Sequence, residues 1–260
     1  VVIAYRDGTN SWYGTAVVGT VSGTSISFGS PAVFESAEVY DYAATFDSTL
    51  NKVVIAFSST SQHGQVTTGT ISGTSISFDT AVKFHAAQTN YLAIAFDSNS
   101  GKSIVTYKNG NGDGGDSVVF APTGFSIPSV GSPTVFESAS SSYTSTIYDS
   151  TNGKIVISYR DGGNSDYGTA VVGTVSGNSI SFGSPVVFNS DRVTDVSSVY
   201  DPDTQKIVIA YQNNGYVSTP AGPDNNYGTA IVGTVSGNSI SFGSPVIFES
   251  ARADLTSATY

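Results

Sequence analysis

The sequence repeats one unit of about fifty residues five times, and this repeat constrains the fold more than any other feature. An aromatic residue closes the first apolar run of each copy, at steps of 52, 50, 52 and 52 residues. These aromatic positions are Tyr5, Phe57, Tyr107, Tyr159 and Tyr211. Two further landmarks keep the same order, namely Phe34, Phe84, Phe136, Phe188 and Phe248, and then Phe46, Phe96, Tyr148, Tyr200 and Tyr260. A period of this length is typical of solenoids and propellers.

One copy is too small to bury its own faces, so we expect the 260 residues to form a single domain. The repeat units run approximately over 1–52, 53–102, 103–154, 155–206 and 207–260. Charged residues make up only 12% of the chain, and Gly, Ser, Thr and Asn punctuate apolar runs of strand length. This pattern predicts an all-β protein.

The copy over residues 143–190 shows four strand-like runs, at 143–148, 154–159, 167–175 and 179–188. Short loops with turn chemistry join them, including Asn152-Gly153 and Ser176-Gly177-Asn178. Strands joined by such tight loops are antiparallel neighbours. Four antiparallel strands in each of five units predict a five-bladed β-propeller.

Two details support this architecture. A proline recurs in the fourth run, which predicts an outer edge strand, because proline cannot donate to a ladder. The prolines are Pro31, Pro133, Pro185 and Pro245. The first run carries small residues at one position, as crowding around a central axis requires, and they are Ala43, Ala93, Ser145, Ser197 and Ser257. Because the chain begins with a second strand and ends with a first, we expect the C-terminal strand, residues 254–260, to join the N-terminal blade and close the ring.

Composition excludes several classes of function. Cysteine and methionine are absent, so there are no disulfides, thiolate metal sites or cysteine nucleophiles. The net charge of −10 argues against nucleic acid as a partner, because phosphate binding needs clustered Lys and Arg. No apolar stretch is long enough to span a membrane, and no signal peptide is evident. Since the chain opens inside a strand pattern, we expect it to be a mature or excised part of a larger protein or assembly.

Short blades in a ring of five resemble the tachylectin-2 type of propeller, which is a lectin architecture. The repeat sequence YRDG.NS.YGTAVVGTVSG.SISFGSPVVF is similar to tandem repeats in predicted proteins of marine viruses and bacteria. The resemblance covers the whole chain as architecture and implies a lectin-like fold. No binding residues follow from this resemblance, because the chain does not match the tachylectin repeat sequence residue for residue.

In a propeller the loops between the second and third strands share one face with the blade-to-blade crossovers, and we call this the loop face. In copies one and four these loops read RDGTNSWY and RDGGNSDY. Planar guanidinium, carboxylate and amide groups satisfy sugar hydroxyls, and an aromatic ring offers an apolar platform. The candidate ligand-binding residues are therefore Arg6, Asp7, Asn10, Trp12, Arg160, Asp161, Asn164 and Asp166. A plainer interpretation stays open, in which the Asp and Asn side chains cap tight turns and the arginines pair with neighbouring carboxylates.

Other motifs in the sequence indicate little. The loop around Trp12 partly resembles the sialidase Asp-box, but an arginine triad is not evident. Residues 109–116 have the oxygen spacing of a calcium loop without its closing glutamate, which favours a glycine-rich turn, and we predict no metal site or cofactor. His63 and His85 have no catalytic or metal-ligand spacing around them.

The sequence thus predicts a non-enzymatic recognition module that binds cell-surface glycans, in an extracellular, cell-surface or virion setting. The alternative is a structural or protein–protein scaffold. A glycoside-acting enzyme using carboxylates such as Glu35 or Asp7 is a third and weaker possibility.

Overall fold

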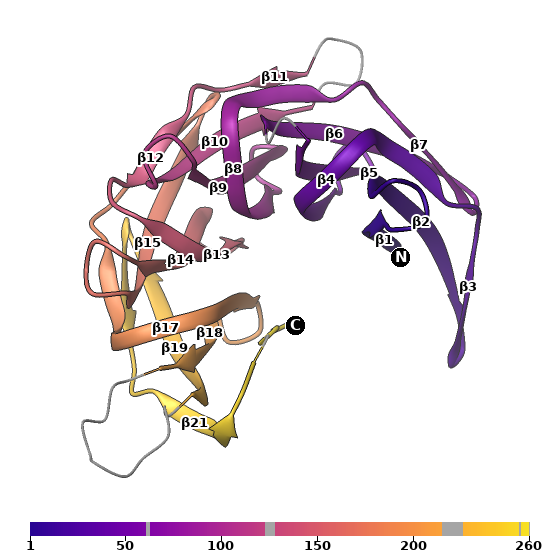
Figure 1. Cartoon of the computed structure of the whole chain (residues 1–260). Helices are drawn as coiled ribbons and strands as arrows, with labels where there is room; N and C mark the ends of the chain where they lie inside the picture. Colours follow the sequence, from indigo (N-terminus) through magenta and orange to yellow (C-terminus); the bar gives the residue numbers. More distant parts are fainter. Residues whose placement is uncertain (61–62, 123–127, 215–225, 255, 260) are drawn as a thin grey trace.

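The computed structural model describes residues 1–60, 63–122, 128–214, 226–254 and 256–259. Within these ranges the chain is all-β, with antiparallel strands and no helix. The strands fall into five successive groups that follow the five sequence repeats, and we call these groups units 1 to 5. Figure 1 shows them arranged side by side along an arc.

The strand bounds are as follows. Unit 1 contains β1 (Val2–Asp7), β2 (Tyr13–Ser22), β3 (Ser25–Phe28) and the first half of β4 (Ala32–Asp47). Unit 2 contains the second half of β4, then β5 (Lys52–Ser59), β6 (His63–Ser72), β7 (Ser75–Phe78) and the first half of β8 (Val82–Asp97). Unit 3 contains the second half of β8, then β9 (Lys102–Asn109), β10 (Gly115–Ala121), β11 (Ser129–Val130) and β12 (Thr134–Glu137). Unit 4 contains β13 (Ser141–Asp149), β14 (Lys154–Asp161), β15 (Tyr167–Ser176), β16 (Ser179–Phe182) and the first half of β17 (Val186–Asp201). Unit 5 contains the second half of β17, then β18 (Lys206–Asn213), β19 (Tyr227–Ser236), β20 (Ser239–Phe242) and β21 (Val246–Arg252).

Three strands of 16 residues, β4, β8 and β17, each run from the outer edge of one unit to the inner edge of the next. They merge the units into two continuous sheets, one of 12 strands and one of 9. The predicted fourth run of the repeat is divided in two. In unit 4 it forms β16 and the start of β17, with Pro185 in the break, where its missing N–H interrupts no ladder.

The core lies between the units. Four clusters of buried apolar side chains fill the four interfaces between successive units. In the first, Phe34 of unit 1 packs on Phe57 of unit 2, with ring centroids 5.2 Å apart. Successive units therefore bury the faces that they turn toward one another, as the repeat predicts.

The prediction of a closed five-bladed ring is wrong for this structure. Figure 1 shows an open arc, with unit 1 and the end of the chain on opposite sides of the opening. In the described residues β1 pairs with β2 alone, and residues 254 and 256–259 form no strand. Residues 255 and 260 of the predicted closing strand lie outside the described residues. The physical reason is geometric, because the packing at the four interfaces sets the curvature, and five units at this curvature leave the ends apart.

Candidate functional site

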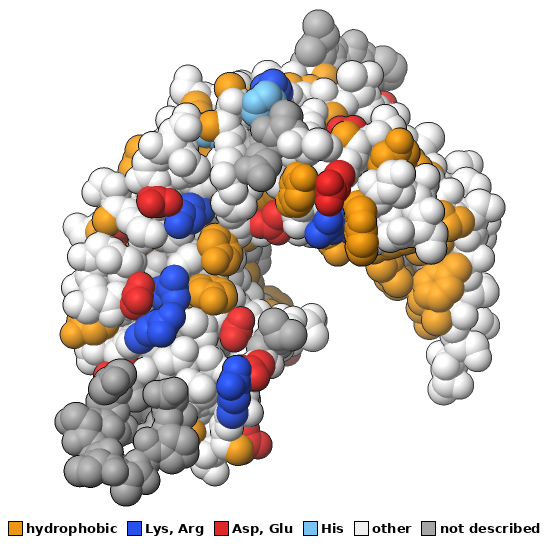
Figure 2. Space-filling view, viewed as in Figure 1, with side chains coloured by type: hydrophobic (Ala, Val, Ile, Leu, Met, Phe, Trp, Pro, Cys, Tyr) orange, Lys and Arg blue, Asp and Glu red, His pale blue; other side chains and the backbone are white. Residues whose placement is uncertain are grey.

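The loop face is formed as the sequence predicts. In unit 1 the Val39 N–H of the crossover donates to the Trp12 carbonyl in the loop at 3.1 Å. In unit 5 the Asn214 N–H donates to the Arg192 carbonyl at 2.8 Å. Figure 2 shows this face, where Lys and Arg side chains lie beside Asp and Glu along the arc.

In unit 1 the loop presents an aromatic and charged cluster. The Arg6 guanidinium lies over two rings, 5.0 Å from the Trp12 centroid and 5.6 Å from that of Tyr40. Its Nη2 also pairs with Glu38 Oε1 at 3.1 Å, and the Tyr40 hydroxyl donates to Glu38 Oε2 at the same distance. Trp12 is 50% exposed, so half of its surface is open to a ligand. Stacked arginine and exposed aromatic faces suit the apolar side of a sugar ring together with its hydroxyls.

The turn residues of this loop have a structural role. Asp7 Oδ1 accepts the Thr9 N–H at 3.0 Å and the Thr9 hydroxyl at 2.7 Å. These bonds lower the pKa of Asp7, with the Thr9 hydroxyl as the largest cause. The backbone of Asn10 closes the turn, accepting from the Tyr13 N–H at 3.0 Å. The plainer interpretation thus describes Asp7 well, whereas Trp12 is exposed beside a half-buried Arg6.

The equivalent loop of unit 4 is built differently. Asp166 replaces the tryptophan, and its carboxylate bridges two arginines, at 3.4 Å from Arg160 Nε and 3.5 Å from Arg192 Nε. The Arg160 guanidinium also lies 5.0 Å from the centroid of the Tyr143 ring. The structure brings Arg160 and Asp166 together but leaves them far along the arc from Arg6 and Trp12.

The two other predicted residues of this loop shape its backbone. Asp161 is buried, and its Oδ1 accepts the Gly163 N–H at 3.0 Å. Burial, and then the nearby Glu137 carboxylate, raise the pKa of Asp161. The Asn164 carbonyl accepts the Tyr167 N–H at 3.0 Å, as Asn10 does in unit 1. Asp161 and Asn164 therefore form the turn.

A polar cavity of about 560 Å³ opens beside this loop, between units 4 and 5. Its walls include Tyr167, Asp191, Arg192, Gln212, Asn214 and Arg252. The size is that of a small-molecule site, and the donors and acceptors converge from two units.

The walls of this cavity are held by hydrogen bonds. Gln212 is buried, with Oε1 accepting the Thr194 hydroxyl at 2.7 Å and Nε2 donating to Asp254 Oδ1 at 2.8 Å. Arg252 Nε pairs with the same carboxylate at 2.8 Å. The walls of the cavity thus include a buried, fixed amide and two exposed guanidinium groups, those of Arg192 and Arg252.

Sequence reasoning did not select Arg192, Gln212, Asn214 or Arg252 as binding residues. A signal for two of them exists in the strand register. The residue opposite the first residue of the third strand is Glu38 in unit 1, Gln88 in unit 2, Arg192 in unit 4 and Arg252 in unit 5. This position changes from an acid to an amide to arginine along the chain, which marks it as a site that distinguishes the units.

The other motifs have structural partners. In the loop at 109–116, the Asn109 side-chain amide donates to Asp116 Oδ2 at 2.7 Å, and Asp113 pairs with Lys108 at 3.0 Å. Within the described ranges no group of three or more His, Asp or Glu side chains could hold a metal ion. His63 Nδ1 lies 2.8 Å from Lys83 Nζ. The carboxylate considered for glycoside chemistry, Glu35, accepts the Ala37 N–H at 3.0 Å.

Comparison with protein families and with curated proteins finds no match. Solved structures do match in fold. One is a mutant of AofleA from Arthrobotrys oligospora with three arginines replaced by alanine, at 9% identity and a TM-score of 0.55, over 99% of this chain and 73% of that one. Another is AofleA itself, at 10% identity and a TM-score of 0.51 over the same shares. At these identities the likeness shows a shared all-β fold and nothing about ligands. Across the described part of the chain, no helix is long and apolar enough to cross a membrane.

Proposed function

We propose that this chain is a non-enzymatic recognition module that binds glycans on its loop face. The observation that carries the proposal is the polar cavity between units 4 and 5, where Arg192, Gln212 and Arg252 converge. Neutral amides and guanidinium groups in a concave site are the donors that sugar hydroxyls and acidic sugar substituents accept from. The all-β fold shared with AofleA is compatible with this class of function.

The aromatic cluster of unit 1 supplies a second and chemically different site in this proposal. Arg6 stacked between Trp12 and Tyr40 offers a ring platform in place of a cavity. Two weak sites on one rigid arc raise the avidity for a surface that displays many copies of a glycan. The proposal includes an extracellular, cell-surface or virion setting and a parent protein or assembly larger than this chain.

A glycan array followed by calorimetry tests this function. Labelled protein is expected to be retained by a subset of glycans, and Arg192→Gln to weaken binding of the best one about tenfold or more, since a charge-assisted hydrogen bond is lost. Lys206→Gln is the matched control, because it removes one positive charge at the Thr234 hydroxyl, outside the cavity. Retention by no glycan would overturn the proposal, and capture of a protein partner would then favour the scaffold alternative.

A further inference from the structure

The aromatic contacts between units recur at every interface of the arc. At three of the four interfaces a phenylalanine of the outer strand packs on two aromatic rings of the next unit. At the interface of units 2 and 3, Phe84 packs on Tyr107. Phe34 lies 5.2 Å from Phe57 and 5.7 Å from Phe78, and Phe188 lies 5.2 Å from Tyr211 and 5.8 Å from Phe242, between ring centroids. The four interface phenylalanines are 6–8% exposed, and they are Phe34, Phe84, Phe136 and Phe188.

The fifth phenylalanine of the series has no such partner in the described structure. Phe248 of β21 is 57% exposed at the C-terminal end of the arc. At the opposite end, the residues that correspond to Phe57 and Phe78 are Tyr5 and Phe28, and Phe28 is 53% exposed. The two ends therefore present the two halves of a fifth aromatic contact.

A glycine position supports the same complementarity. At Gly29, Gly131 and Gly183 an added Cβ would lie 1.8–1.9 Å from a carbonyl oxygen in the next unit, so the backbones there are in close contact. At the equivalent Gly243 the nearest atom to such a Cβ is the Val232 carbonyl oxygen, 3.8 Å away. The C-terminal face thus keeps the shape of a unit interface, and no described residue lies close to Gly243 from a following unit.

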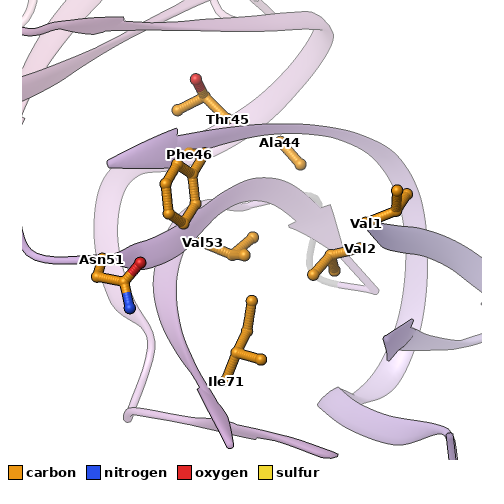
Figure 3. A pocket seen from close by; sticks show the side chains of 8 residues that line it. All are labelled: Val1, Val2, Ala44, Thr45, Phe46, Asn51, Val53 and Ile71. Carbon is orange, nitrogen blue, oxygen red and sulfur yellow. The ribbon is translucent and has the colours of Figure 1, made fainter. Parts of the chain in front are cut away.

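The strand edges complete the pattern. Residues 256–259 lie where the inner strand of a following unit would begin. The Ala258 N–H donates to Ser197 Oγ at 3.0 Å, and the equivalent bond between the inner strands of units 5 and 4 joins the Ser198 N–H to Ser145 Oγ, also at 3.0 Å. At the other end, the free edge of β1 borders an apolar cavity of about 570 Å³. Figure 3 shows the side chains that line it, among them Val2, Phe46 and Val53. In units 2 to 5 an inner strand pairs at this place, as β13 does with β14 in unit 4.

We propose that the C-terminal face of one copy of this chain docks on the N-terminal face of a second copy, head to tail. Phe248 of the first copy then packs on Tyr5 and Phe28 of the second, and residues 256–259 pair with its β1. The interface continues one that the chain already makes four times within itself. Within one copy the two faces lie on opposite sides of the opening and do not meet (Figure 1). Such a heterologous contact builds rings or open chains of arcs, with every loop face left accessible.

Engineered cysteines distinguish docking of a second copy from closure by the chain's own end. The experiment is clean because the chain has no cysteine of its own. The pairing of Ser145 with Ser158 in unit 4 places Ser257 opposite Ala4 when the register is repeated at the new interface. Proteins carrying Ala4→Cys alone and Ser257→Cys alone are mixed and oxidised. A disulfide-linked dimer with one chain of each kind is expected, at several times the yield of either protein oxidised alone.

The double variant Ala4→Cys/Ser257→Cys tests whether the two ends of one chain can pair with each other instead. An intrachain disulfide on a monomer would overturn the proposal in favour of closure by the chain's own end, and no cross-link in either experiment would also overturn it.

Sedimentation velocity measures the mass of the assembly without any cysteine substitution. The mass is expected to rise with protein concentration and to stay monomeric in Phe248→Asp, while Val135→Asp, at an equally exposed apolar position on β12, still assembles.

Discussion

The Arg6 guanidinium lies 5.0 Å from the centroid of the Trp12 ring, whereas the equivalent Arg160 pairs with Asp166 at 3.4 Å. The repeated arginine lies beside a ring and a carboxylate in both units, but different positions supply them. They are Trp12 and Glu38 in unit 1, and Tyr143 and Asp166 in unit 4. The backbone of the two loops is alike, with left-handed residues at the same two positions, Ser11 and Trp12 in one and Ser165 and Asp166 in the other. The repeat conserves the loop shape while the side chains on it differ, so the units are expected to prefer different ligands.

Replacement of Trp12 by alanine is expected to weaken glycan binding at unit 1 about fivefold. The stacking of an exposed ring on a sugar or cation contributes about 1 kcal/mol, and every 1.4 kcal/mol is a factor of ten in affinity. Trp12→Tyr should keep most of the affinity because it keeps the platform. Calorimetry measures both, and in the unsubstituted protein the emission of Trp12, the only tryptophan, should shift on binding. Equal affinity of Trp12→Ala and the parent would show that this ring is not part of a site.

Much of the fold could be predicted from the sequence because the repeat fixes the strands locally. The alternation along Lys154–Asp161 and the turn at Gly153, with φ of +62°, define a hairpin without reference to the rest of the chain. The shape of the arc could not be predicted in this way. It depends on how closely Phe188 packs on Tyr211 and its counterparts at the other interfaces, and small angles there add up over five units.

The candidate site was predictable only in part, for a related reason. Arg6 and Trp12 are close in sequence, so their loop reveals them. The cavity between units 4 and 5 joins Arg192 of a crossover to Gln212 of the next strand and to Arg252 at the chain end. Residues brought together from separate segments have no local sequence signature.

The two aspartates at the loop starts, Asp161 and Asp7, should influence stability with opposite dependence on pH. Burial raises the pKa of Asp161, so the folded state holds this proton to higher pH than the unfolded chain does. Its contribution to stability therefore falls as pH rises above the ordinary aspartate value and stays low at neutral pH. The pKa of Asp7 is lowered by the Thr9 bonds, so its contribution is present above the ordinary value and is lost as pH falls through the folded pKa.

Asparagine at each position tests this difference in thermal melts between pH 2.5 and 7. Relative to the parent, Asp161→Asn is expected to gain stability as pH rises, since an asparagine oxygen can still accept the Gly163 N–H. Asp7→Asn is expected to lose stability over the same range. The same direction of change for both variants would contradict the assigned pKa shifts.

Gly168→Ala is expected to destabilise the fold by about 1–3 kcal/mol, because the added methyl group overpacks the interface between units 4 and 5. Its Cβ would lie 2.3 Å from the Phe188 ring, which is itself buried against Tyr211. Gly112→Ala is the matched control, since an added Cβ there meets no atom of the described residues within 4 Å. Urea unfolding followed by circular dichroism gives both values. Equal midpoints for the two variants would show that the ring moves aside at no cost.

Ser145→Ala is expected to cost about 1–2 kcal/mol, because it removes the acceptor of the buried Ser198 N–H at 3.0 Å and leaves that donor without its partner. Alanine fits the position, as Ala43 and Ala93 occupy it in units 2 and 3, so the change isolates the hydrogen bond. Ser197→Ala removes the equivalent bond to the Ala258 N–H near the chain end, where the described residues 256–259 form no strand. Ser197→Ala should therefore lower the stability of dilute protein less than Ser145→Ala does. Its effect should grow once a higher protein concentration favours head-to-tail contact. Melting temperatures of both variants at low and high protein concentration measure the difference, and a concentration effect on Ser145→Ala alone would contradict it.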